Sequence, residues 1–152
     1  DGAVPEPGDL DGDANDLLAT ARRRFDETGD SIAACRFRAG LGAAMSLAQA
    51  ANRYLDKKEP WKTVKDDRLS AAAALWVSIA TINCLKTALY PVLPFSSERL
   101  HSMLGLEGSV EDQGWAWDPH AIKGGRPLQE PERLFTKLDE AIIEEESQRI
   151  GH

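Results

Sequence analysis

The chain has 152 residues, 42% of them hydrophobic and 28% charged, which is enough for one domain with its own core. A net charge of −7 argues against a nucleic-acid binder that works through a broad cationic surface. The charge is uneven, because residues 1–30 carry −6, residues 31–100 carry +5 and residues 101–152 carry −6. Any contact with nucleic acid is therefore expected in the middle third.

Cysteine and histidine are too few and too scattered to predict a zinc site. Cys35 and Cys84 are far apart in the sequence, and the chain has only three histidines. We expect both thiols to be reduced, buried and structural. The most apolar stretch, residues 69–93, is interrupted by polar side chains, so we expect no membrane span.

The first half of the chain predicts an opening loop and two helices. Residues 1–13 are rich in Gly, Pro and acids, which indicates a loop. Apolar residues recur at helical spacing over residues 14–27, with Asp13 as N-cap and Gly29 as the stop. A second helix is predicted from residue 30 or 31 to Pro60.

The second half predicts three further helices. A central, strongly apolar helix covers residues 67–90, and a short one covers residues 95–104, with Gly105 as its C-cap. An irregular linker, residues 105–131, is expected to be pinned by Trp115 and Trp117. A last, acidic helix begins between residues 131 and 137 and ends near Arg149.

No stretch alternates as a strand does, and short connections favour antiparallel neighbours, so we predict an all-α antiparallel bundle of about five helices. Residues 14–152 would be the helical domain, with 14–104 as the bundle core, 105–131 as the linker and 132–152 as the C-terminal helix. Lys and Arg are expected on exposed faces of the second and third helices and in the turn between them.

Catalytic motifs are missing from the sequence. It contains no G-x-x-x-x-G-K-[ST] or G-x-G-x-x-G pattern, and the Gly124-Gly125 pair is predicted to form a turn. His101 and His120 have no partner of nucleophile or ligand type nearby in the sequence, so we expect structural or surface roles. We expect no active site in this chain.

One segment combines an aromatic ring with basic and polar side chains. Trp61 follows Pro60, and Asn52 and Asp56 lie one helical turn apart before it. Unpaired RNA bases stack on aromatic rings, and their edges are read by hydrogen bonds. The basic residues around the ring are Arg53, Lys57, Lys58, Lys62 and Lys65. The segment predicts a site for single-stranded RNA.

The alternative is that Trp61 folds back over the bundle as a hydrophobic cap and the lysines only solvate the turn. Trp76, Trp115 and Trp117 lack the basic surroundings, so we expect them to pack in the core or against it.

The segment N-x-Y-x-D-x-x-x-P-W, from Asn52 to Trp61, strongly resembles the helical anticodon-binding domain of bacterial-type methionyl-tRNA synthetases. Lys65 and residues 90–100, 104–106, 125–128 and 131–138 extend the similarity over essentially the whole chain. The resemblance implies a helix bundle that follows a class I catalytic domain in the same polypeptide. That enzyme would join methionine to tRNA(Met) with ATP, in the cytoplasm.

The resemblance also implies roles for single residues. Trp61 would stack on an unstacked base of the CAU anticodon loop, and Asn52 and Asp56 would discriminate the anticodon. The basic side chains named above would steer the loop toward the ring. We expect no cofactor in this chain, since ATP, and zinc where present, would belong to the catalytic part. We also expect no membrane or DNA partner.

The sequence departs from the family pattern in having no HIGH-like or KMSKS-like signature and no zinc knuckle. The family's first bundle helix is expected before Asp1, so we expect a truncated C-terminal piece that is not active alone. Phe135, Leu138 and Ile142 are expected to pack on the bundle or on the catalytic domain.

Two other functions remain open at this point. The chain could be the anticodon-binding domain of an isoleucyl, valyl, leucyl or cysteinyl synthetase, which would prefer another anticodon. It could also be a helical protein-interaction module that docks through its last helix and Trp115 and Trp117. Such a module would bind no tRNA even at low salt.

Overall fold

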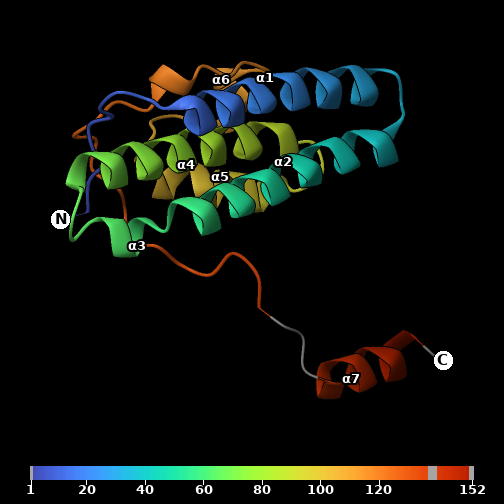
Figure 1. Ribbon diagram of the computed structural model, residues 1–152. Helices are drawn as coiled ribbons and strands as arrows, with labels where there is room; N and C mark the ends of the chain where they lie inside the picture. Colours follow the sequence, from blue (N-terminus) through green and yellow to red (C-terminus); the bar gives the residue numbers. More distant parts are fainter. Residues whose placement is uncertain (1, 137–139, 151–152) are drawn as a thin grey trace.

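The computed structural model describes residues 2–136 and 140–150. Figure 1 shows three long helices side by side: α1 (Gly12–Ala33), α2 (Phe37–Lys58) and α4 (Arg68–Leu89). The shorter elements are α3 (Pro60–Thr63), α5 (Pro94–Met103), α6 (Val110–Gln113), the 3₁₀ turn η1 (Pro119–Ala121) and α7 (Glu140–Ile150). No strand occurs in these two described ranges, and the predicted all-α antiparallel bundle is confirmed.

Aspartates fix the starts of α1 and α4. The Asp11 side chain accepts a hydrogen bond from the Ala14 N–H at 3.0 Å, which satisfies one of the free donors of the first turn. The first helix therefore begins slightly earlier than the predicted N-cap, Asp13. The predicted start of the central helix is confirmed, because Asp67 accepts from the N–H groups of Leu69 and Ser70.

The boundary between α1 and α2 differs from the prediction. Gly29 does not end the first helix but lies inside it, and a Cβ at this position would meet Trp115 Nε1 at 2.7 Å. The missing side chain leaves room for Trp115 to stack on Phe25, with 4.8 Å between ring centroids. The chain turns at Cys35, whose φ is 56°. This turn leaves Cys35 exposed, contrary to prediction, whereas Cys84 is buried as predicted.

α4 is the centre of the bundle, because it packs against α1, α2, α3, α5 and η1. The hydroxyls of Ser78 and Thr81 donate to carbonyl oxygens one turn earlier in the same helix, so neither is left unpaired in the core. By length and composition α4 could also cross a membrane, contrary to the sequence expectation, but two thirds of its most apolar 18-residue window is buried in this bundle. Its buried small and apolar residues include Ala71, Ala73, Ala74, Val77, Ala80 and Ala88.

The linker after α5 is held to α4 by tryptophans. Trp117 is buried and its Nε1 donates to the Ala80 carbonyl at 3.1 Å. From the other side, Trp76 Nε1 donates to the Ile122 carbonyl at 2.9 Å. The prediction of a linker pinned by aromatics is confirmed, with Trp76 as an additional anchor.

The opening segment is irregular, as expected, yet it is fixed in place. Its Val4 side chain is buried, and the Val4 N–H donates to the Arg126 carbonyl at 2.9 Å. Two further backbone hydrogen bonds join Gly125 to Val4 and Leu128 to Gly2. The opening segment and the linker therefore lie side by side.

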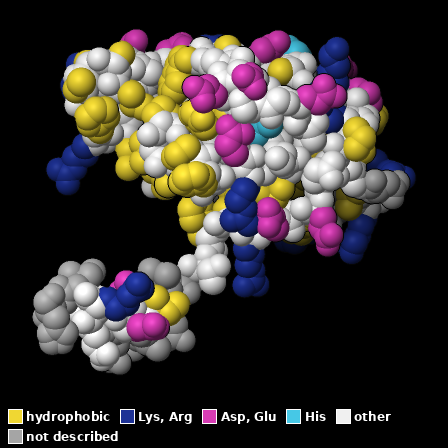
Figure 2. Space-filling view, turned by 180° about the vertical axis from the view of Figure 1, so that it is seen from behind, with side chains coloured by type: hydrophobic (Ala, Val, Ile, Leu, Met, Phe, Trp, Pro, Cys, Tyr) yellow, Lys and Arg dark blue, Asp and Glu magenta, His cyan; other side chains and the backbone are white. Residues whose placement is uncertain are grey.

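The C-terminal part is less compact than predicted. Residues 131–136 are not helical, so the last helix does not begin there, and residue 138 lies outside the described ranges. Figures 1 and 2 both show α7 standing clear of the bundle, and Ile142 is exposed rather than packed on it. Phe135 is also largely exposed, although it lines a hollow over α4 and α5.

Lys86 is buried, which corrects the expectation that lysines lie on exposed faces. α5 and α6 cover it, and its Nζ donates to Gln113 Oε1 at 2.8 Å and lies 3.2 Å from His101 Nδ1. His101 is buried too, with Nε2 3.1 Å from the Glu107 carbonyl oxygen. Burial lowers the pKa of Lys86 from 10.5 to about 8.

Gly105 offers a test of the packing between α5 and the linker. Its φ is +66°, and an added Cβ would overlap the Pro127 carbonyl oxygen. We expect Gly105→Ala to lower the free energy of unfolding by roughly 2–4 kcal/mol, the sum of a left-handed backbone and an overpacked contact. Gly125→Ala is the matched control, since φ is +76° but nothing lies within 4 Å. Urea unfolding curves for the two variants should differ; equal losses would contradict the role of the contact.

Lys86 makes stability depend on pH. Between pH 8 and 10.5 the folded state has released a proton that the unfolded state still holds, so the free energy of unfolding should rise with pH, by up to roughly 3 kcal/mol. We expect Lys86→Met to lack this rise and Lys65→Met, at an exposed position, to keep it. Urea unfolding of both variants at pH 7.5 and pH 10 measures the change in unfolding free energy between the two pH values. Comparing the two variants cancels the contribution of the other titrating groups.

Candidate nucleic-acid interface

The chain makes a tight turn between α2 and α4 that carries Trp61. α2 ends at Lys58, its C-cap Glu59 has φ 41°, and Pro60 is buried at the first position of α3. Proline cannot continue α2 but suits the start of α3, because its φ is already helical. The Thr63 hydroxyl donates to the Lys58 carbonyl at 2.9 Å, and the Asp67 N–H donates to the Thr63 carbonyl at 2.8 Å. Both ends of α3 are therefore held by hydrogen bonds.

Trp61 lies on the outer side of this turn. Its side chain is 55% exposed, so the ring does not fold back over the bundle as a hydrophobic cap. The neighbouring Pro60 takes the buried position instead. An exposed indole on a turn held at both ends is a surface on which an unpaired base can stack.

The polar residues predicted for the site divide between two faces of α2. All four of Asn52, Arg53, Asp56 and Lys57 are exposed. At 3.6 residues per turn, Asn52 and Asp56 share one face, whereas Arg53 and Lys57 share the neighbouring face, turned toward α1. The sequence therefore predicted that Asn52 and Asp56 share a face of α2, but not that the cations lie on a separate face.

Lys57 and Lys58 are bound by the beginning of α1. Lys57 Nζ lies 2.7 Å from Asp13 Oδ1, and Lys58 Nζ lies 2.8 Å from Asp13 Oδ2 and 2.5 Å from Asp11 Oδ2. Hydrogen bonds from the two lysines lower the pKa of Asp13 from 3.8 to about 2. The pKa of Asp11 is also lowered, chiefly by its hydrogen bond with Lys58.

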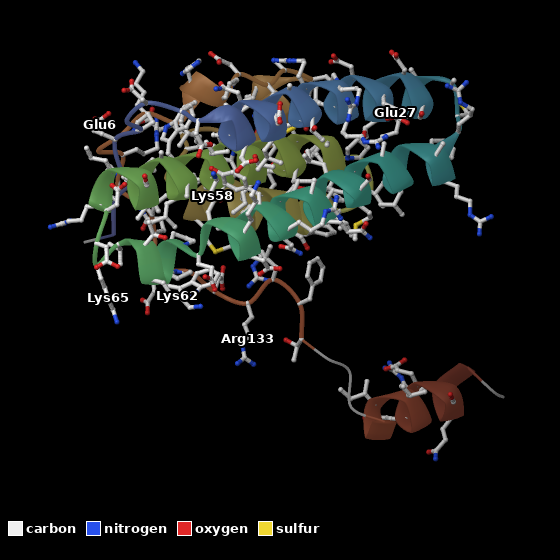
Figure 3. All side chains as sticks on the ribbon, in the orientation of Figure 1. Glu6, Glu27, Lys58, Lys62, Lys65 and Arg133 are labelled. Carbon is white, nitrogen blue, oxygen red and sulfur yellow. The ribbon has the colours of Figure 1, made fainter. Side chains whose placement is uncertain are left out.

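The lysines after the tryptophan are exposed. Lys62 Nζ pairs with Glu59 Oε1 at 2.6 Å within the turn, and Lys65 has no carboxylate within 4.0 Å among the described residues. Figure 3 shows Lys62 and Lys65 at the end of the bundle where α3 lies, with Lys65 pointing away from the helices. Lys65 is thus the cation of this turn most free to meet a phosphate.

Sequence reasoning missed three residues that build the site. Asp11 and Asp13 hold Lys57 and Lys58 from more than forty positions away, and no local pattern signals such pairs. Tyr54 is buried beneath them, where burial raises its pKa to about 12 and Lys58 Nζ lies 5.8 Å from its ring centroid. Its position one turn before Lys58 was a usable signal, because it falls on the buried face of the helix.

Two hollows flank the ion pairs. One, of about 230 Å³, lies between α1 and α2 and is lined by Asp13, Asp16, Arg53, Tyr54 and Lys57, among others. The other, of about 260 Å³, is also lined by Tyr54 and Lys57, together with Asp11, Lys58 and residues of α4. Within the described ranges no group of three His, Cys, Asp or Glu residues could hold a metal ion. The arrangement offers an aromatic ring, polar edges and cations to a ligand.

Comparison with known proteins decides the family. The sequence model described as "Anticodon binding domain of methionyl tRNA ligase" matches residues 4–152. The chain belongs to this family. Over 98% of its length it is 37% identical to the methionine–tRNA ligase of Roseiflexus sp. (strain RS-1), and over 99% it is 39% identical to that of Thermomicrobium roseum. It spans less than a third of the length of these relatives.

Solved structures have the same fold as this anticodon-binding domain. The apo form of Mycobacterium tuberculosis methionyl-tRNA synthetase matches 91% of the chain with a TM-score of 0.80 and 23% identity. The match covers 28% of that enzyme's chain. The same enzyme in complex with methionyl-adenylate matches 90% of the chain with a TM-score of 0.79.

The ion pairs of Asp13 predict how the anticodon-binding domain responds to acid. Because the pKa of Asp13 is depressed in the folded state, its stabilising effect is complete above about pH 4 and is lost as the pH falls toward 2. We expect Asp13→Asn to melt below the wild type at pH 6, with the difference vanishing near pH 2. Asp16→Asn, which removes an exposed carboxylate with no ion pair in the described ranges, should show no such convergence. Thermal melts followed by circular dichroism measure this.

Proposed function

We propose that the chain is the anticodon-reading part of a methionine–tRNA ligase and that it recognises the CAU loop of tRNA(Met). The observation that carries this proposal is the exposed Trp61 ring on a turn fixed at both ends. Membership of the family supports the same function. Stacking of one base on such a ring contributes about 1–3 kcal/mol.

Base identity is selected beside the ring. Asn52 carries an amide that can both donate and accept, and Asp56 carries an acceptor, so together they can match a pattern on a base edge. Both side chains are exposed on one face in the last two turns of α2. A base that presents the wrong edge would leave one of these groups without a partner.

The cations supply attraction without selectivity. Arg53, Lys57, Lys62 and Lys65 are exposed around the turn, in a chain whose net charge is negative. Only a few phosphates can contact these side chains. The logarithm of the affinity should therefore fall with the logarithm of the salt concentration with a slope that corresponds to only a few released ions. Discrimination between loops then rests on the bases.

In the whole enzyme the chain would follow a class I catalytic domain in the same polypeptide. That domain would bind methionine and ATP and join methionine to the tRNA, and this chain alone would not catalyse the reaction. We propose a cytoplasmic location, as the family resemblance implies, and no DNA or membrane partner, which suits a net charge of −7.

The test is a titration of the chain with a labelled methionine anticodon stem–loop and a CAU→GAU variant, followed by anisotropy of the label. We expect the wild type to prefer the CAU loop. Trp61→Ala should weaken binding of that loop by about 5- to 150-fold, the equivalent of one lost stack. Trp61→Phe, which keeps a smaller ring, should lose less.

Trp115→Phe is the matched control, because Trp115 is the other partly exposed tryptophan and stacks on Phe25 away from the basic turn. It should bind as the wild type does. If Trp61→Ala weakens the binding of both loops equally, Trp61 is a generic or structural residue and does not contribute to selection of the anticodon. Preference for another anticodon would indicate a different class I synthetase, and absence of binding to any tRNA at low salt would favour a protein-interaction module.

A further inference from the structure

One carboxylate bridges the two lysines that precede the tryptophan turn. Asp13 uses one oxygen for Lys57 at 2.7 Å and the other for Lys58 at 2.8 Å. Both pairs suit the helices that carry them, because an acid in a first turn and cations in a last turn each interact favourably with the helix dipole. The helix dipoles therefore favour the bridge in the free protein.

The two lysines differ in how accessible they are. Lys58 is only 19% exposed and is paired with two carboxylates, so it ties α2 to α1. Lys57 is 64% exposed, has Asp13 as its one carboxylate partner in the described ranges, and faces the hollow that Arg53 also lines. Lys58 is an anchor, whereas Lys57 can exchange its partner.

A carboxylate and a phosphate present the same kind of group to an ammonium. Each offers anionic oxygens at about 2.7–2.9 Å, and the ammonium binds either as a point charge. A phosphate of an RNA strand that approaches Lys57 meets an ammonium whose charge Asp13 Oδ1 already offsets, so the two anions compete for it. The same carboxylate also repels a strand that passes through the hollow beside it.

We propose that Asp13 is a specificity-determining residue that competes with RNA phosphates for Lys57. It lowers the affinity for every RNA backbone at this turn and leaves selection to the contacts with bases. The inference rests on the proposed function for its biological meaning, although the competition itself concerns any RNA strand.

The competition is permanent under physiological conditions. Hydrogen bonds from the lysines hold the pKa of Asp13 at about 2, so the carboxylate is ionised throughout the neutral range. The other charged groups near Lys57 are Asp16 and Arg53, which line one hollow with it, and Asp9, Asp11 and Lys58, which line the other. The device is therefore a fixed counter-charge and not a pH switch.

The experiment compares the wild type with Asp13→Asn and Asp16→Asn. Both substitutions remove one negative charge from the same hollow, but only the first removes an ion pair to Lys57. The probes are the CAU stem–loop, its GAU variant and an unrelated RNA hairpin, each titrated at several salt concentrations. Thermal melts confirm that each variant is folded at the working temperature.

We expect Asp13→Asn to bind all three RNAs about two- to fivefold more tightly, the range expected when one exposed ion pair is released. The slope of log affinity against log salt concentration should steepen by roughly one released ion. The preference for CAU over GAU should not change. Asp16→Asn should gain less. In a Lys57→Gln background, Asp13→Asn should gain no more than Asp16→Asn does.

Equal gains in Asp13→Asn and Asp16→Asn would overturn the proposal, because net charge alone would then explain them. Weaker binding by a folded Asp13→Asn would overturn it as well, since Asp13 would then serve to position Lys57. The proposed function has a separate test in the wild type, which must prefer CAU over GAU. If the wild type shows no such preference, the affinities of the wild type and Asp13→Asn for the unrelated hairpin still decide whether Asp13 competes with phosphates for Lys57.

A measurement without RNA tests the ion pair directly and does not depend on the RNA affinity of the variant. Acylation of lysines by an activated ester, followed by mass spectrometry, reports how free each ammonium is. Lys57 should react faster in Asp13→Asn than in the wild type, with Lys65 unchanged as the internal reference. Unchanged reactivity of Lys57 would show that Asp13 does not hold it, and would overturn the proposal.

Discussion

The structure depends on one constraint, which is that α4 is apolar around most of its circumference and must be covered over most of its length. α1 and α2 cover two faces, α5 a third, and the linker with η1 a fourth. The closeness of this cover comes from small residues, such as Ala74 and Ala80, that allow backbones to approach. Because α2 and α4 run antiparallel and in contact, the short segment between them is forced outward, and Trp61 is presented at the end of the bundle.

The sequence predicted what depends on neighbouring residues. Helical spacing located the long helices. The pattern around Pro60 located the tryptophan turn, because a proline ends a helix whatever the helix packs against. Features that depend on distant neighbours were missed. Gly29 has the composition of a stop signal but serves to admit Trp115, and Lys86 looks like a surface residue until α5 and α6 cover it. The aspartates that hold Lys57 are likewise invisible to a local pattern.

The charge distribution explains how an acidic chain can present a surface for RNA. Its acids are concentrated in the outer thirds of the sequence, whereas ten of its 18 cations lie in residues 31–100, six of them from Arg53 to Arg68 around the α2–α4 turn. Folding brings part of the first third back onto that turn, so some of the positive charge is offset within the molecule. What remains for a ligand is a small cationic area around an exposed ring, which favours recognition of a few nucleotides over binding of a long strand.

The pairing of the opening segment with the linker has a mechanical consequence. The backbone hydrogen bonds from Val4 and Gly2 to residues 125–128 lie between the start of the described chain and α1. A pull on that end is carried into the linker, and through Ile122 and Trp76 into the body of α4. The first turn of α1, with Asp11 and Asp13, lies beyond these hydrogen bonds along the chain and so receives less of this load. The tryptophan turn is thereby shielded in part from displacements of the first residues of the described chain.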